Sequence, residues 1–97
     1  MPEDFLEEFI RRRAERNPSF PALVDAAIER RDLLRALAKA REQSGLTQTE
    51  VAAAMGTSQS QVARLESATV DARLSTVEKL AAVLGKKVEW RIVDAPR

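Results

Sequence analysis

The chain has 97 residues, of which 44% are hydrophobic and 32% charged, and its formal net charge is +1. This length allows one domain with a modest core, and the hydrophobic content is that of a globular protein. The sequence has no cysteine, histidine or tyrosine, which excludes the usual zinc ligands, a thiol nucleophile and the commonest general base. The carboxylates follow no spacing typical of a metal or phosphate site. We therefore expect neither an enzyme nor a cofactor nor a metal.

Charge is uneven along the chain. Residues 1–30 hold seven acidic and five basic residues, whereas residues 31–97 hold eight acidic and eleven basic ones. DNA binding would therefore depend on a local surface in the second part and not on a broad basic field. The sequence has neither an apolar run as long as a membrane span nor the apolar centre of a signal peptide, so we expect a cytoplasmic protein.

The N-terminal segment, residues 1–30, combines apolar and charged residues at helical spacing. Its apolar residues are Phe5, Leu6, Phe9 and Ile10, and the helix-breaking stretch 17–21 follows them. This pattern predicts a short amphipathic helix and then a turn. Two roles stay open with equal weight: the apolar stripe packs on the protein's own core, or it binds a partner protein that covers it.

The central segment, residues 31–85, carries clear helix signals. Gly45, Gly56 and Gly85 each follow an apolar helical pattern, which is typical of a left-handed C-cap. Capping boxes begin at Thr47, Ser58 and Ser75, each with Glu or Gln three residues later. These signals predict helices from Pro21 or Asp32 to Ser44, from Gln48 to Met55, from Gln59 to Ser67, and from Thr76 to Leu84.

The two short helices in the middle need tertiary support, because an isolated helix of about eight residues is not stable in water. Their apolar faces should therefore pack together with the last helix. The predicted core consists of Val51, Ala52, Met55, Val62, Leu65, Leu74, Val77, Leu80, Ala81 and Leu84.

The C-terminal segment, residues 86–97, changes period. Val88, Trp90 and Ile92 alternate with Glu89, Arg91 and Val93, which predicts one short β-strand with an apolar face. A single strand needs a partner for its backbone, and no other segment offers one. We therefore expect a homodimer in which this strand pairs with that of a second copy.

Residues 46–66 resemble the lambda-repressor-like, or Xre, helix-turn-helix family. The resemblance extends over the Arg-x-x-x-Gly-Leu-Thr-Gln entry from Arg41, the turn at Gly56, the exit Arg64-Leu65-Glu66, and the later Leu-Ser-Thr-Val-x-x-Leu pattern. It implies an all-α domain of four to five helices that binds a palindromic operator in double-stranded DNA and regulates transcription.

The predicted helix from Gln59 has a polar outer face that fits a major groove about 12 Å wide. The residues that would read bases are Gln59, Ser60, Ala63 and Arg64. Glutamine pairs well with adenine and arginine with guanine, so Gln59 and Arg64 are the first candidates. Taken alone, these side chains are ordinary solvated residues, and only the surrounding motif favours a role in DNA binding.

The resemblance also implies positions that touch the DNA backbone and a pair that serves folding. Gln48 would contact phosphate and brace the first recognition side chain, with Thr57 and Ser58 near the backbone. Arg73 lies where the family often has a Gly-Lys turn and a proline, and it is equally a phosphate contact or a surface charge. Arg41 and Glu66 would form a buried ion pair that stabilises the fold.

The whole arrangement resembles HigA-type antitoxins of bacterial toxin–antitoxin pairs. This resemblance implies a repressor of its own operon that neutralises a small ribonuclease toxin of the RelE-like fold through its N-terminal segment. The acidic surplus of residues 1–30 suits a small basic partner. The alternatives are a stand-alone dimeric Xre-type repressor, and an interaction module without DNA binding, against which the intact face of Gln59, Ser60 and Arg64 argues.

Overall fold

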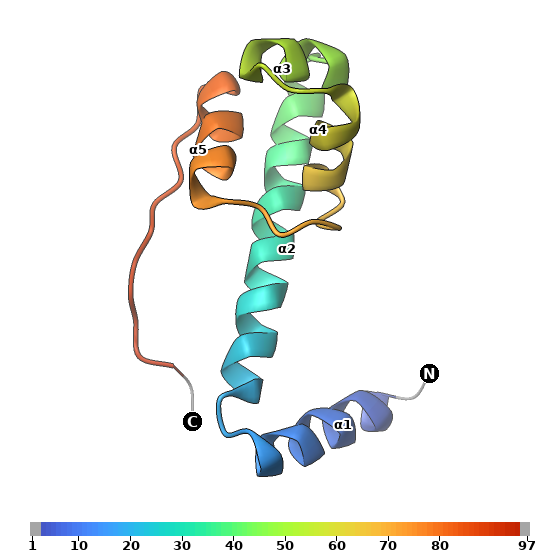
Figure 1. The fold of residues 1–97 in the computed structure, drawn as a ribbon, viewed down its shortest axis with the longest axis vertical. Helices are drawn as coiled ribbons and strands as arrows, with labels where there is room; N and C mark the ends of the chain where they lie inside the picture. The colour runs from blue at the N-terminus through green and yellow to red at the C-terminus, as the bar shows by residue number, and fades with distance from the viewer. Residues whose placement is uncertain (1–2, 96–97) are drawn as a thin grey trace. The chain divides into compact units, whose positions relative to one another are not determined.

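A computed structural model describes residues 3–95, and within them the chain forms five helices and no strand (Figure 1). The all-helical class predicted from the sequence is thereby confirmed. The helices are α1 (Glu3–Arg16), α2 (Phe20–Gln43), α3 (Gln48–Met55), α4 (Gln59–Glu66) and α5 (Leu74–Val83). None of them, over the described residues, is both long and apolar enough to cross a membrane.

The chain divides into two compact units. One unit holds the residues up to Glu29 together with those from Val93 on, and the other is Arg30–Ile92. Helix α2 begins at Phe20, close to Pro21, the earlier of its two expected starts, and continues through the division. The second unit contains the C-terminal half of α2 with α3, α4 and α5.

Helix α3 begins with the capping box that the sequence predicts. The Thr47 hydroxyl accepts a hydrogen bond from the Glu50 backbone N–H at 3.0 Å, and Glu50 Oε1 accepts one from the Thr47 N–H at 3.0 Å. At the start of α4, the Ser58 hydroxyl accepts from the Gln61 N–H at 3.2 Å. Both short helices therefore have their first orphan N–H groups satisfied.

The start of α5 differs from the prediction. The last residue with extended backbone is Arg73, whose side chain makes no cap hydrogen bond, so the helix begins at Leu74. Ser75 consequently lies inside the first turn and cannot act as the N-cap. Leu74, expected in the core, is 61% exposed. Both expectations were wrong for the same reason, since the chain turns helical earlier than the capping pattern indicates.

The turn between α3 and α4 requires glycine. Gly56 has φ of +73° and donates its N–H to the carbonyl oxygens of the last turn of α3. A side chain is disfavoured in this left-handed conformation, which glycine adopts without strain. After α4, Ala68 adopts the same left-handed conformation, with φ of +56°. The Xre-type proteins that the sequence resembles often have a glycine in this stretch.

The hydrophobic core of the second unit is shared by all four of its helices, and α3 contacts both α4 and α5. Leu34 and Leu37 from α2 add to the residues predicted for it. Its buried members are Leu34, Leu37, Val51, Ala52, Met55, Val62, Leu65, Val77, Leu80, Ala81 and Leu84. Each large apolar side chain enclosed here stabilises the fold by roughly 1.5–3 kcal/mol, which is what keeps the two eight-residue helices folded.

The C-terminal strand is absent from the single chain, which corrects the prediction. Residues 86–95 form no strand in the single chain, because a strand needs a second extended segment to pair with and the described residues contain none. Val88 packs partly against the core, and Trp90 Nε1 donates to Glu78 Oε2 at 3.1 Å. Ile92 is fully exposed.

The first unit has its own small aromatic contact. The rings of Phe9 and Phe20 meet edge to face, with centroids 6.2 Å apart, and the Arg13 guanidinium lies 5.2 Å from the Phe9 ring centre. Even so, Phe5, Leu6 and Phe9 are 53%, 59% and 41% exposed. Helix α1 therefore keeps most of its apolar stripe uncovered, and only Ile10 is less exposed than these three.

Candidate nucleic-acid interface

The outer face of α4 presents all four predicted base-reading residues together. Val62 and Leu65 are buried in the core, which turns the opposite side of this eight-residue helix outward. The outward residues are Gln59, Ser60 and Arg64, which are exposed, and Ala63, which is partly exposed. The small Ala63 leaves room for close approach to a base edge.

The first residues of α3 and α4 are joined by their side chains. Gln59 Nε2 donates to Gln48 Oε1 at 2.7 Å. Gln48 is half-buried between the two helices, whereas Gln59 is exposed. The bond restricts the rotamers of Gln59 before any ligand arrives, which lowers the entropic cost of using that side chain in binding.

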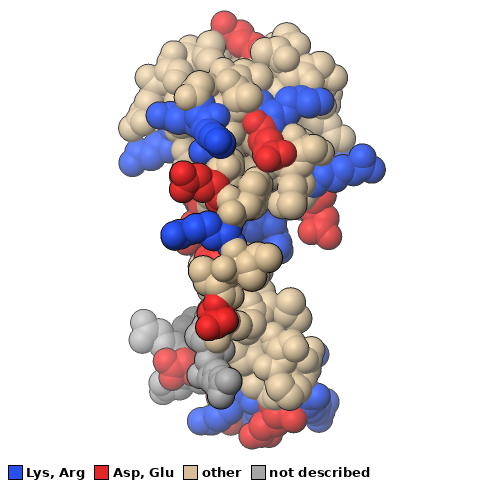
Figure 2. Space-filling model, turned by 90° about the vertical axis from the view of Figure 1, so that its left-hand side faces the viewer, with Lys and Arg blue, Asp and Glu red and all other residues tan. Residues whose placement is uncertain are grey.

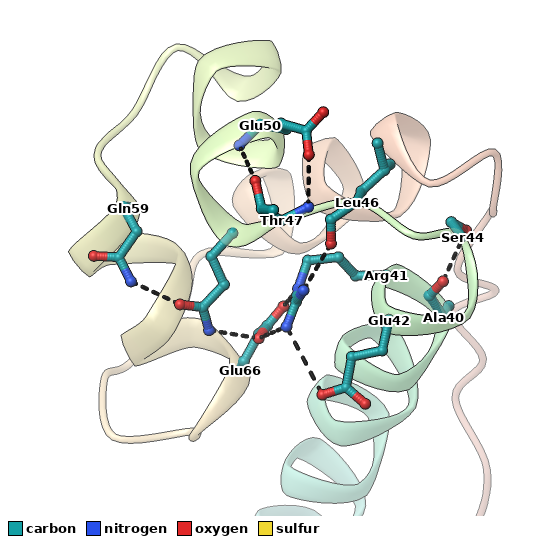
Figure 3. A network of polar contacts seen from close by, with 10 residues as sticks. Ala40, Arg41, Glu42, Ser44, Leu46, Thr47, Glu50, Gln59 and Glu66 are labelled. Carbon is teal, nitrogen blue, oxygen red and sulfur yellow. Dashed lines mark hydrogen bonds and ion pairs between the residues drawn. The ribbon is translucent and has the colours of Figure 1, made fainter.

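The same network continues inward to an ion pair (Figure 3). Glu66 Oε1 accepts from Gln48 Nε2 at 2.8 Å and from Arg41 Nη2 at 3.0 Å, and Glu66 Oε2 accepts from Arg41 Nε at 2.6 Å. Arg41 Nη1 also donates to the Leu46 carbonyl oxygen at 2.8 Å. Arg41 thus ties α2 to the turn before α3 and to the end of α4.

Both partners of the ion pair are largely enclosed, with side-chain exposures of 12% for Arg41 and 8% for Glu66. Burial by itself raises the pKa of Glu66, but hydrogen bonds from Arg41 and Gln48 and the charge of Arg41 outweigh it, so this pKa lies below its usual value. The hydrogen bond to Glu66 raises the pKa of Arg41. Both groups are therefore charged at neutral pH.

The other predicted phosphate-contact residues lie in the segments that precede α4 and α5. Thr57 and Ser58 are exposed in the turn before α4, and Arg73 is exposed just before α5. Thr57 and Arg73 line the same open hollow, together with Lys79. The Ser58 hydroxyl caps α4 and forms a second hydrogen bond with the Ser60 hydroxyl at 3.2 Å, which leaves one hydrogen-bonding position for a further contact.

The net charge of only +1 leaves little surplus for a broad basic field on the chain. Figure 2 views the side of the molecule on which α5 lies, and there Lys and Arg side chains are interspersed with Asp and Glu. Over the described residues no three acidic side chains gather as metal ligands. Attraction to a phosphate backbone must therefore come from individual side chains near α3 and α4.

The comparison with known families agrees with this geometry. The helix-turn-helix family profile matches residues 37–91, more than half of the chain, and includes the whole of α3, α4 and α5. The chain belongs to the helix-turn-helix family. The match is to the Xre type. Searches of curated proteins and of solved structures find no match.

In a helix-turn-helix domain the second helix of the motif enters the major groove and the first crosses the DNA backbone. Here these are α4 and α3, joined by the turn at Gly56. The helix-turn-helix match makes this chain a DNA-binding regulator at the level of the family. The match does not include α1, and it ends at Arg91, within the C-terminal segment.

Three contacts of this region are not predicted by the sequence: Gln48 to Glu66, Arg41 to the Leu46 carbonyl, and Trp90 to Glu78. Gln48 and Glu66 are 18 positions apart, so no helical or strand periodicity links them. Only the packing of α3 across α4 brings the two side chains within hydrogen-bond distance.

Proposed function

We propose that this chain is a sequence-specific transcriptional regulator that reads DNA with the outer face of α4. Gln59, Ser60, Ala63 and Arg64 contact base edges in the major groove. The observation that carries the proposal is the exposed Gln59 held by Gln48 at 2.7 Å on a capped helix. A rigid recognition surface of this kind discriminates between bases better than a mobile one.

The surrounding residues position the protein without reading sequence. Gln48, Thr57, Ser58 and Arg73 contact phosphates on the strands that border the groove. These contacts fix the register of α4 on the duplex. Arg41 and Glu66 act in folding, because their charges are enclosed and satisfy each other.

The test compares two arginines. Arg64→Ala should weaken the binding free energy for the preferred site by about 1–3 kcal/mol and relax the sequence preference at one base pair. Arg73→Ala should weaken binding to all sequences evenly. Both are measured by fluorescence anisotropy on a site selected from random duplexes. If a Gln59→Ala, Arg64→Ala double variant that is folded by circular dichroism kept full sequence specificity, the assignment of α4 would be wrong.

We also propose that two copies pair through their C-terminal tails at Val88, Trp90 and Ile92. The backbone of residues 87–92 makes no hydrogen bond to other described residues, and Trp90 and Ile92 are 46% and 103% exposed. Such a segment is a template for a second extended chain. The dimer then binds a palindromic operator whose half-sites lie one helical turn, roughly 34–36 Å, apart.

A second function is favoured by the apolar stripe of α1. Phe5, Leu6 and Phe9 are about half exposed, with Ile10 beside them, and an uncovered stripe of this size is typical of a protein-binding helix. We propose that the stripe binds a small basic ribonuclease toxin of the RelE-like fold. The chain is then an antitoxin that represses its own operon, as HigA-type proteins do.

The antitoxin proposal is tested by co-purification from the native chromosomal neighbourhood. A C-terminally tagged chain should retain a small basic protein in stoichiometric amount and lose it when Leu6→Asp is introduced in the exposed stripe. The matched control is Glu7→Gln on the neighbouring polar face, which should retain it. Recovery of promoter DNA without any protein would favour the alternative, a stand-alone dimeric repressor.

A further inference from the structure

The hydrogen-bond chain from Arg41 to Gln59 has a direction that chemistry dictates. A charged carboxylate only accepts hydrogen bonds. Glu66 therefore obliges Gln48 to face it with the amide nitrogen, as the 2.8 Å bond from Gln48 Nε2 to Glu66 Oε1 shows. The Gln48 amide oxygen is then turned towards α4.

The same reasoning applies one residue further out. The Gln48 oxygen cannot donate, so Gln59 must face it with its own amide nitrogen, at 2.7 Å. The Gln59 Oε1 is consequently turned away from the network, as Figure 3 shows. A glutamine without this constraint can present either end of its amide, because the two orientations differ little in shape.

We propose that Glu66 is a positioning residue for base recognition, which acts through Gln48 to fix the orientation of the Gln59 amide. The inference rests on the proposed function of α4 and deepens it. Glu66 itself touches no base, since its side chain is only 8% exposed. Arg41 supports this positioning, because its two hydrogen bonds hold the Glu66 carboxylate in its charged, accepting form.

A fixed amide orientation has a consequence for the base that Gln59 prefers. The outward group offers one oxygen acceptor and one remaining N–H donor side by side. Adenine presents a complementary donor and acceptor in the major groove, whereas guanine presents two acceptors, so the fixed oxygen would face the guanine O6. Gln59 thus selects adenine over guanine because it cannot flip its amide.

The first experiment observes the orientation without DNA. In ¹⁵N-labelled full-length protein, the Gln59 side-chain amide should show slowed hydrogen exchange, since one of its protons is bonded to Gln48. Gln48→Met has nearly the same volume but makes no hydrogen bond, so exchange at Gln59 should rise to that of an exposed glutamine. Gln61→Met is the matched control on α4, because among the described residues the Gln61 side chain joins no network.

The second experiment measures the base preference. Random duplexes are selected with the wild-type protein, and affinities are then compared for duplexes that differ only by adenine or guanine at the position sensitive to Gln59→Ala. A good paired contact discriminates about 5- to 150-fold. We expect Gln48→Met to lower this ratio several-fold towards that of Gln59→Ala, while Gln61→Met leaves it unchanged.

The ratio separates positioning from general support. Loss of a phosphate contact by Gln48 weakens both duplexes equally and leaves the ratio intact, so an intact ratio in Gln48→Met would overturn the proposal. Glu66→Gln, whose amide both donates and accepts, should lower the ratio in the same way if that variant folds. If it unfolds, Gln48→Met decides alone.

The two arms also distinguish this inference from the proposed function. Selection of no sequence by the wild-type protein would refute DNA reading by α4, and with it the base preference. Unaltered exchange at Gln59 in Gln48→Met would refute the positioning alone, whatever DNA the protein binds.

Discussion

Arg41 shows how much a single side chain contributes to this domain. Its guanidinium donates to both oxygens of Glu66 and to the Leu46 carbonyl, so three chain segments depend on one charge. Since the side chains of Arg41 and Glu66 are only 12% and 8% exposed, removal of one leaves the other charged and without its partner. That situation is far more costly than the loss of a surface ion pair.

We expect Arg41→Met to lower the free energy of unfolding by about 3–5 kcal/mol, as for other enclosed pairs that lose one partner. Urea denaturation followed by circular dichroism measures the change. The control is Arg35→Met on the exposed side of α2, which should alter stability by no more than about 0.5 kcal/mol. Equal effects of the two substitutions would mean that the ion pair does not contribute to the free energy of unfolding beyond what an exposed arginine does.

The lowered pKa of Glu66 predicts a pH dependence of stability. Because the pKa is lower in the folded chain than in the unfolded one, its contribution is present above the ordinary glutamate value of about 4.5 and is lost as pH falls through the folded-state value. Unfolding measured from about pH 5 downward should therefore show decreasing stability. The slope should be shallower in Glu66→Gln, and an unchanged slope would exclude Glu66 as its source.

At the scale of helices, the same capping pattern in the sequence forms a cap at one helix start and not at another. Thr47 and Ser75 both begin a Ser/Thr-x-x-Glu pattern, but only Thr47 caps its helix. Thr47→Ala should lower the free energy of unfolding by about 1 kcal/mol, whereas Ser75→Ala should change it by less than about 0.5 kcal/mol. Thermal unfolding of the two variants makes the comparison, and a reversed order would place the start of α5 at Ser75 after all.

The end of α4 offers a stabilising substitution. Ala68 adopts φ of +56° while its N–H donates to the Leu65 carbonyl at 3.0 Å, so its methyl group lies in a conformation that disfavours L residues by about 1–2 kcal/mol. Ala68→Gly relieves that strain, although glycine also adds entropy to the unfolded chain, which offsets part of the gain in stability. The midpoint of thermal unfolding should therefore rise. The converse change, Gly56→Ala at φ +73°, should lower it.

At the scale of the whole molecule, the tail sequence predicts how two copies would align. An antiparallel pair centred on Trp90 sets Val88 opposite Ile92 of the second copy, and Glu89 opposite its Arg91. Apolar then meets apolar on one face, and opposite charges meet on the other, which favours this register over its neighbours. Glu89 and Arg91 are both exposed in the single chain.

Charge exchange tests that register. Glu89→Arg and Arg91→Glu should each weaken the dimer by about 0.4–2 kcal/mol, because two like-charged pairs replace two favourable ones. The doubly exchanged chain should recover it, and a mixture of the two single variants should form mixed dimers. Sedimentation equilibrium and native mass spectrometry give the readout, and additive losses in the doubly exchanged chain would rule out this alignment.

Most of the helical domain is predictable from local signals. The bounds of α3 match the expectation, and those of α4 differ only at its last residue, because Thr47, Ser58 and Gly56 act on the backbone within a few residues. The core follows from apolar periodicity in the same way. Leu74 and the α5 start escape prediction because a capping pattern is only one of several ways to satisfy the first turn of a helix.

By itself the sequence determined α3 and α4 with their caps, most of the core, and the outward face of Gln59, Ser60 and Arg64, since each depends on neighbours within one or two turns. Only the tertiary structure decided that Gln48 reaches Glu66, that Trp90 bonds to Glu78, and that the tail forms no strand in one chain. Those outcomes depend on which surfaces meet across segments far apart in sequence. Hydrogen-bond geometry is sensitive to ångström-scale placement, and residue spacing alone does not specify it.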